Sequence, residues 1–270
     1  MIKVNDRHID LVTSGEGPDI LFVPGSFSTP AAWQSIQKHL PQRYRFLSTS
    51  LCGYGETTET RTLHDNSINH EIEILNQITA SIQKPVHLVG HSFGGLVCFV
   101  AVLIGKLKVK SLTTFEANPI TLLEEKNVFR FRKIRKISEN FERQYFLGEK
   151  DAVKTIIDFW GGRGSFSSMP KVVQEYCRST GFANVLDWRS ALSFKTSSDD
   201  FRDWKVPCLI VRGERANHEM IEITDALSKS ISNSKISVVS GANHFLISSH
   251  PAICANLLAN FLQEIDEGKR

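Results

Sequence analysis

A glycine-framed serine between two apolar runs is the feature that most constrains the fold of this chain. Residues 86–89 read Val-His-Leu-Val, Ser92 stands between Gly90 and Gly94, and residues 96–102 form the second apolar run. This Gly-x-Ser-x-Gly spacing is typical of a sharp strand–turn–helix that lifts a serine hydroxyl above a sheet. A Cβ atom at either glycine would collide with the neighbouring strand or helix. The pattern therefore predicts an α/β fold with Ser92 at one edge of the sheet.

Length and composition limit the classes of protein that need to be considered. A chain of 270 residues with 41% hydrophobic and 23% charged residues fits one α/β domain with an inserted segment. The net charge of +3 is too small to favour nucleic acid or an anionic membrane as a partner. No apolar run approaches the roughly 20 residues of a membrane span. Residues 1–6 contain no apolar signal core, which predicts a cytoplasmic protein.

The cysteines indicate a reduced protein. There are five of them, widely spaced and without a C-x-x-C pair. Most lie in apolar neighbourhoods, as reduced core cysteines do. We therefore expect neither a disulfide framework nor a zinc site.

Six short apolar runs predict the strands of the sheet, and each is followed by a turn rich in Gly or Pro. These runs are residues 19–23, 44–48, 86–89, 112–115, 208–211 and 236–239. They alternate with helical segments, which predicts a doubly wound, mostly parallel sheet with helices on both faces. In open sheets of this kind, ligands bind at the carboxyl ends of the strands.

Residues 120–201 interrupt this alternation and predict a helical lid inserted into a core made of residues 1–119 and 202–270. Apolar residues recur between positions 134 and 145 at the three-to-four-residue spacing of a helix. A basic cluster within residues 130–136 is interpreted as the solvated face of that helix, with attraction of an acidic substrate or partner as the alternative.

His244 is the candidate base for Ser92. A serine hydroxyl needs a base to take its proton during attack, and histidine titrates near neutral pH. His244 follows the last predicted strand, after the flexible Gly241, where an imidazole can return over the sheet edge. His91, next to the serine, is expected to pack against the site or line a pocket.

Two backbone amides are candidates for stabilising an oxyanion. One belongs to Phe93, the residue after the serine, and the other to Ser26, which follows Gly25 in the loop after the first predicted core strand. The amide of Phe27 is the alternative to that of Ser26.

The motifs together resemble the α/β-hydrolase superfamily. Pro24-Gly25, residues 52–55 (Cys-Gly-Tyr-Gly), residues 90–95 and Ala242-Asn243-His244-Phe245 stand in the order and spacing of that superfamily. The chain is similar to its lidded serine esterase, haloperoxidase-like and C–C-bond hydrolase branch. The resemblance implies the α/β-hydrolase fold and a nucleophile–acid–histidine order. The usual His-Gly after the first core strand is Pro24-Gly25 here.

The acid of the implied triad departs from the usual pattern. Many relatives place a carboxylate after the penultimate strand, where this chain has Ala216. Without an acid, the imidazolium formed during attack would lose its charge partner and its tautomer control. Glu116, which ends the preceding predicted strand, is the favoured candidate because a carboxylate buried there needs a partner. Glu214 and Glu219 are the alternatives.

These residues predict a serine hydrolase that forms an acyl-enzyme and needs no cofactor or metal. The predicted partner is a small to medium, partly apolar ester or related acyl substrate. A C–C-bond hydrolase or lyase on the same triad, and a non-catalytic small-molecule receptor, are the alternative functions. Phe27, His91 and Trp160 are the predicted pocket residues, and the other aromatic candidates are Trp33, Phe93 and Phe166.

Overall fold

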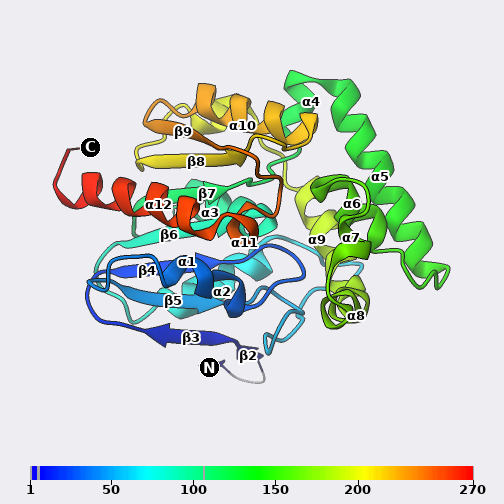
Figure 1. Ribbon diagram of the computed structural model, residues 1–270, viewed down its shortest axis with the longest axis horizontal. Coiled ribbons are helices and arrows are strands. Elements are labelled where there is room, and N and C mark those ends of the chain that lie inside the picture. Colours follow the sequence, from blue (N-terminus) through cyan, green and yellow to red (C-terminus); the bar gives the residue numbers. More distant parts are fainter. Residues whose placement is uncertain (1, 5–6, 106, 270) are drawn as a thin grey trace.

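A seven-stranded sheet forms the centre of the molecule (Figure 1). The computed structural model describes residues 2–4, 7–105 and 107–269. Residues 1, 5 and 6, which belong to the segment predicted to contain no signal core, lie outside the described part. The strand order is β3-β5-β4-β6-β7-β8-β9, with β3 antiparallel to β5 and the other neighbours parallel. The strands are β3 (Leu11–Ser14), β4 (Asp19–Val23), β5 (Arg45–Thr49), β6 (Val86–His91), β7 (Val109–Phe115), β8 (Cys208–Gly213) and β9 (Ser234–Val239). All six predicted strands are present. Beside the sheet, β1 (Ile2–Val4) pairs with β2 (Arg7–Ile9).

Helices cover both faces of this sheet. Alternate side chains of a strand point to opposite faces, so Ile20 and Phe22 enter one hydrophobic cluster while Leu21 and Val23 enter the other. The first cluster is completed by α1 (Gln34–Gln37), α11 (Leu246–Ser249) and α12 (Pro251–Asp266). The second is completed by α2 (Asn69–Thr79), α3 (Ser92–Leu103) and α10 (His218–Ser230). The predicted doubly wound architecture is therefore confirmed.

Between β7 and β8 the chain forms a group of helices at one end of the sheet (Figure 1). These are α4 (Leu122–Lys126), α5 (Val128–Phe146), α6 (Lys154–Gly161), α7 (Ser165–Ser168), α8 (Lys171–Ser179) and α9 (Gly181–Ser193), which we call the helical insertion. Its two ends meet, since the Thr121 hydroxyl donates to the Phe194 carbonyl at 2.8 Å and lies 2.8 Å from the Thr196 hydroxyl. A short 3₁₀ turn (Ser198–Phe201) then leads back to the sheet.

The basic cluster on α5 contacts the core as well as solvent. The Lys133 ammonium lies 2.7 Å from a carboxylate oxygen of Glu219, and the Arg130 guanidinium lies 3.1 Å from the same oxygen. Arg130 also pairs with Glu222 at 2.5 Å. These ion pairs join the helical insertion to α10. The carboxylate of Glu219, one of the candidate acids, therefore pairs with α5, and His244 pairs with Glu116.

Three further features concern the hydrophobicity of the helices, the cysteines and the grouping of metal-binding residue types. Within the described ranges, no helix is both long and apolar enough to cross a membrane. All five cysteines are buried and free, as expected of reduced core cysteines. In the same described part of the chain, no group of three His, Cys, Asp or Glu side chains is placed to hold a metal ion.

Candidate active site

Ser92 lies in a strained turn between β6 and α3. Its φ is 52°, a left-handed conformation that non-glycine residues rarely adopt. A Cβ atom added to Gly90 would lie 2.7 Å from the Cα of Gly95, and one added to Gly94 would lie 2.1 Å from the Pro24 carbonyl oxygen. The sequence-based explanation for both glycines is therefore confirmed: the helix, the strand and the following loop approach too closely for any side chain.

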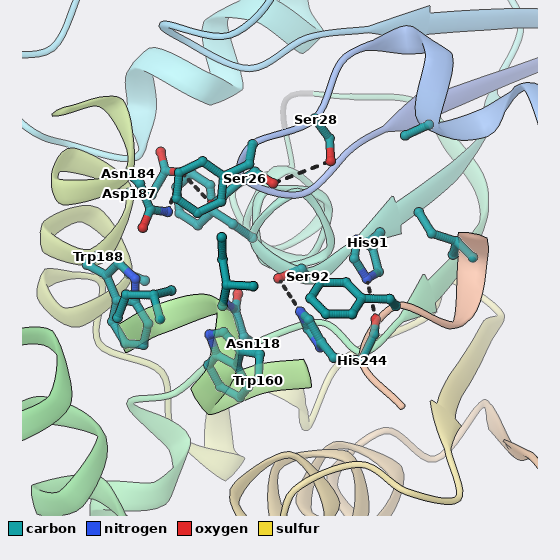
Figure 2. Close-up of a pocket in the computed structure, with 18 of the residues that line it drawn as sticks. Ser26, Ser28, His91, Ser92, Asn118, Trp160, Asn184, Asp187, Trp188 and His244 are labelled. Carbon is teal, nitrogen blue, oxygen red and sulfur yellow. Dashed lines mark hydrogen bonds between the residues drawn. The ribbon is translucent and has the colours of Figure 1, made fainter. Parts of the chain in front are cut away.

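His244 lies in the loop after β9 and reaches back to the serine. Its Nε2 atom is 3.0 Å from the Ser92 hydroxyl oxygen. The loop can fold in this way because Gly241 has a φ of 72°, and because Gly213 leaves room for the Ala242 carbonyl, which would lie 2.3 Å from an added Cβ atom. Figure 2 shows the Ser92 and His244 side chains pointing toward each other.

Glu116 follows β7 and completes a hydrogen-bonded chain. Its Oε2 atom lies 2.7 Å from Nδ1 of His244, and its Oε1 atom accepts the Gly213 amide at 2.8 Å. The carboxylate therefore places the imidazole proton on Nδ1 and leaves Nε2 free to accept the proton of Ser92. Glu116 has a φ of 48° and is buried, so the fold holds it in a strained position at the end of its strand.

Glu214, the other candidate acid, contacts the loop and not His244. It accepts the Gly241 amide at 2.7 Å and the Ser240 hydroxyl at 3.0 Å. The hydrogen bond from the Gly241 amide, followed by that from Ser240, lowers the pKa of this exposed carboxyl. Glu214 therefore stabilises the turn that precedes His244.

His91 contacts His244 through the backbone of that residue. Its Nε2–H donates to the His244 carbonyl at 2.9 Å, and the two ring centroids lie 5.0 Å apart. Burial, with a smaller contribution from the nearby His244, lowers the pKa of His91 to about 3. His91 is thus neutral at physiological pH and carries its proton on Nε2.

The loop after β4 lies against the serine. A Cβ atom on Gly25 would be 2.9 Å from the Cβ of Ser92, so the backbone passes directly beside this serine. Phe27, two residues later, has a φ of 59°. Among the described residues, the amides of Ser26 and Phe93 have no hydrogen-bond acceptor within the chain. Both amides are therefore available as hydrogen-bond donors.

A pocket lined by the core and the helical insertion surrounds this site (Figure 2). The predicted residues Phe27, His91 and Trp160 all line it, and so does Phe93. Trp160 stacks on His244, with centroids 5.3 Å apart and planes 24° from parallel. Of the other aromatic candidates, Trp33 packs in the core against Phe22, and Phe166 lies under the Arg178 guanidinium, so neither reaches the pocket.

The sequence interpretation missed the polar residues that α9 contributes. Asn184 and Asp187 line the pocket together with Trp188 and Ala191 of the same helix. Their spacing of three to four residues places them on one helix face. Two polar residues on an otherwise buried helix face are a signal from which a pocket wall could have been predicted.

Asp187 belongs to a buried network of charged residues. It accepts hydrogen bonds from the Ser26 hydroxyl at 2.5 Å, the Tyr54 hydroxyl at 2.7 Å and the Arg61 guanidinium at 2.7 Å. Arg61 also pairs with Glu59 at 2.8 Å and with Glu71 at 3.0 Å. This network (Arg61, Glu59, Glu71 and Asp187), which we call the Arg61 cluster, connects α9 to residues 59–61 and to α2. The hydrogen bond from Ser26 to Asp187 joins it to the loop that carries Ser26.

Comparisons with known proteins identify the family of this chain. The sequence model described as "Alpha/beta hydrolase family" matches residues 20–257. Monoacylglycerol lipase ABHD6 of Mus musculus is 25% identical over 267 residues, covering 93% of this chain and 77% of the mouse protein. The pimeloyl-[acyl-carrier protein] methyl ester esterase of Aliivibrio fischeri (strain MJ11) is 31% identical over 107 residues, covering 40% of this chain and 39% of its own length.

Solved structures show the same fold. A thermophilic esterase from Thermogutta terrifontis superposes with a TM-score of 0.77 at 17% identity, covering 96% of this chain and 94% of the esterase. The family match spans most of the chain and includes the segments that carry Ser92, Glu116 and His244. The chain belongs to the α/β hydrolase family.

Proposed function

We propose that this protein is a serine hydrolase that cleaves an ester or related acyl substrate through an acyl-enzyme. The observation that carries the proposal is the continuous chain of hydrogen bonds from the Ser92 hydroxyl through His244 to Glu116. The esterase and lipase names of the relatives support an ester as the substrate.

In the first half of the reaction, the Ser92 oxygen attacks the substrate carbonyl carbon while Nε2 of His244 takes the hydroxyl proton. The negative charge moves to the carbonyl oxygen, where the Ser26 and Phe93 amides stabilise it. Glu116 stabilises the imidazolium and keeps its orientation. The tetrahedral intermediate then expels the alcohol, which receives the proton from His244, and leaves the acyl group on Ser92.

In the second half, a water molecule attacks the acyl-enzyme. His244 takes a proton from this water, the same amides stabilise the second oxyanion, and the proton returns to Ser92 as the carboxylic acid leaves. The products are one acid and one alcohol. Every proton transfer uses His244, and none of these steps requires a cofactor.

The helical insertion acts in this proposal as a lid. It supplies the pocket wall opposite the nucleophile, including Trp160 and Trp188. Excluding water from such a site strengthens the hydrogen bonds made to the developing charge. Residues 1–119 and 202–270 then form the catalytic core.

A fluorophosphonate probe and p-nitrophenyl butyrate test the proposal together. We expect the wild-type protein to form an adduct on Ser92 and to hydrolyse the ester, and Ser92→Ala to lose the adduct and about 10⁴–10⁶-fold in kcat. Ser248→Ala is the matched control, because this serine lines the pocket outside the hydrogen-bonded chain. Absence of an adduct on native protein would instead favour a non-catalytic receptor.

A further inference from the structure

Three buried polar atoms at the pocket have no hydrogen-bond partner among the described residues. They are Nδ1 of His91, Oδ1 of Asn118 and Oδ1 of Asn184, and each residue is at most 7% exposed. His91 Nδ1 faces Gly25, where an added Cβ atom would lie 2.9 Å away, so the chain itself covers this atom. Of the two asparagines, Asn184 is the one whose amide is oriented by a described neighbour, so its oxygen remains for a ligand.

The orientation of Asn184 is determined by its neighbour. Its Nδ2 atom lies 3.5 Å from Oδ2 of Asp187, and a carboxylate attracts the amide nitrogen and repels the amide oxygen. Oδ1 of Asn184 is therefore the atom without a partner. Figure 2 shows Asn184 and Asp187 together on the wall contributed by α9, apart from the pair formed by Ser92 and His244.

Asp187 itself is not free to bind a substrate. Its two oxygens accept hydrogen bonds from Ser26, Tyr54 and Arg61, and the guanidinium compensates its charge. A ligand on this wall therefore meets the neutral amide oxygen of Asn184 in preference to a bare carboxylate. This favours a neutral donor over a cation.

We propose that Asn184 forms a subsite for a neutral hydrogen-bond donor on the substrate, such as a hydroxyl or amide N–H group. The proposal rests on the ester hydrolase function above and narrows its substrate class from partly apolar esters to esters that carry a donor. Asp187 is the positioning residue that orients the Asn184 amide.

The energetic reason is the cost of enclosing an acceptor without a partner. An apolar substrate that fills the pocket either leaves Asn184 Oδ1 unpaired or traps water beside it. A substrate hydroxyl restores the hydrogen bond. Sites built around such a bond discriminate strongly against analogues that lack it. We expect a preference of about 10- to 100-fold in kcat/KM for the donor-bearing member of a matched pair.

Two pairs of nearly isosteric esters test the subsite and locate it. Methyl 6-hydroxyhexanoate and methyl heptanoate place the donor on the acyl side. The 2-hydroxyethyl and propyl esters of hexanoic acid place it on the alcohol side. We expect the wild-type protein to prefer the hydroxylated ester in one pair, and that pair identifies the side of the scissile bond that faces α9.

Asn184→Leu should reduce this preference to about threefold or less while the apolar ester is still hydrolysed. Asn256→Leu is the matched control, because Asn256 is exposed on α12, and it should retain the wild-type ratio. Should Asn184→Leu fail to fold by circular dichroism, Asn184→Ala makes the same test with less steric change.

The outcomes separate this proposal from the function on which it rests. Equal kcat/KM within both pairs, or a preference that persists in the Asn184 variant, would overturn the subsite and leave the ester hydrolase intact. Hydrolysis of none of the four esters, together with no fluorophosphonate adduct, would overturn both proposals.

Discussion

Two buried networks, on different walls of the same pocket, use a carboxylate in different ways. Glu116 binds His244, and the chain of hydrogen bonds ends at the Ser92 hydroxyl. Asp187 accepts hydrogen bonds from Ser26, Tyr54 and Arg61, so protein donors use both oxygens of its carboxylate. We call this a closed network. A chain of hydrogen bonds that ends on a hydroxyl in a pocket can take the proton of that hydroxyl and pass it to a substrate. A closed network can instead hold two parts of the fold together.

The two networks also differ in the number of carboxylates for each positively charged or basic group. Glu116 is one carboxylate beside one imidazole, whereas the Arg61 cluster holds three carboxylates around one guanidinium. Burial raises the pKa of both Glu71 and Asp187, and Arg61 opposes that effect. The guanidinium is therefore what allows two carboxyls to be buried at the contact between the core and α9.

The comparison is tested most strongly by neutralising Glu116. We expect Glu116→Gln to lower kcat by about 10⁴-fold, because an amide no longer stabilises the imidazolium or enforces its tautomer. Steady-state ester hydrolysis measures this loss. Glu214→Gln, the control, should stay within about threefold of wild type. A Glu116→Gln enzyme within tenfold of wild type would show that another group orients His244.

Removing the guanidinium of the closed network should affect stability first. We expect Arg61→Met to lower the free energy of unfolding by about 3–5 kcal/mol, because it leaves buried carboxyls without their counter-ion. Urea unfolding measures the change. Arg135→Met removes an exposed ion pair with Glu139 and should cost less than about 1 kcal/mol. Similar losses in the two variants would contradict the structural role of the Arg61 cluster.

The smallest expected effect is a difference in pH dependence between the two regions. His91 has an ordinary pKa of 6.5 when unfolded and about 3 when folded, so its contribution to stability is present above pH 6.5 and is lost as the pH falls. Between pH 7 and 5 the wild-type protein should lose about 2 kcal/mol more than His91→Gln.

Asp187 should respond in the opposite direction. Its folded pKa is raised, so the folded state holds the proton more tightly and acidification favours folding at this site. Urea unfolding of wild type and Asp187→Asn at both pH values provides the comparison. An equal pH dependence in wild type and His91→Gln would show that His91 is not held neutral by the fold.

Much of the core was predictable because its signals are local. The six parallel strands are short apolar runs that end in turns, and all six are present. The antiparallel strand β3 was missed because Leu11–Ser14 is short and mostly exposed, so it carries no buried run. The strands β1 and β2 lie outside the seven-stranded sheet, and they were missed because each has only three residues.

The candidate site was predictable in part. Ser92 and His244 stand in sequence contexts that only a few backbone conformations satisfy. Glu116 was one of three candidate acids, and its distance of 2.7 Å from His244 separates it from Glu214 and Glu219. Asp187 was overlooked because its partners are far away in sequence, with Arg61 126 positions earlier in the chain, and Asn184 was overlooked with it.

The sequence by itself determined the strand–turn–helix around Ser92, the order of the strands along the chain and the late return of His244. These features depend on steric exclusion and on hydrophobic periodicity, which neighbouring residues set. Only the tertiary structure decided which carboxylate meets the imidazole, and which side chains of α9 close the pocket. Those contacts depend on ångström distances between elements that pack together after long separations in the chain, and no local pattern encodes such distances.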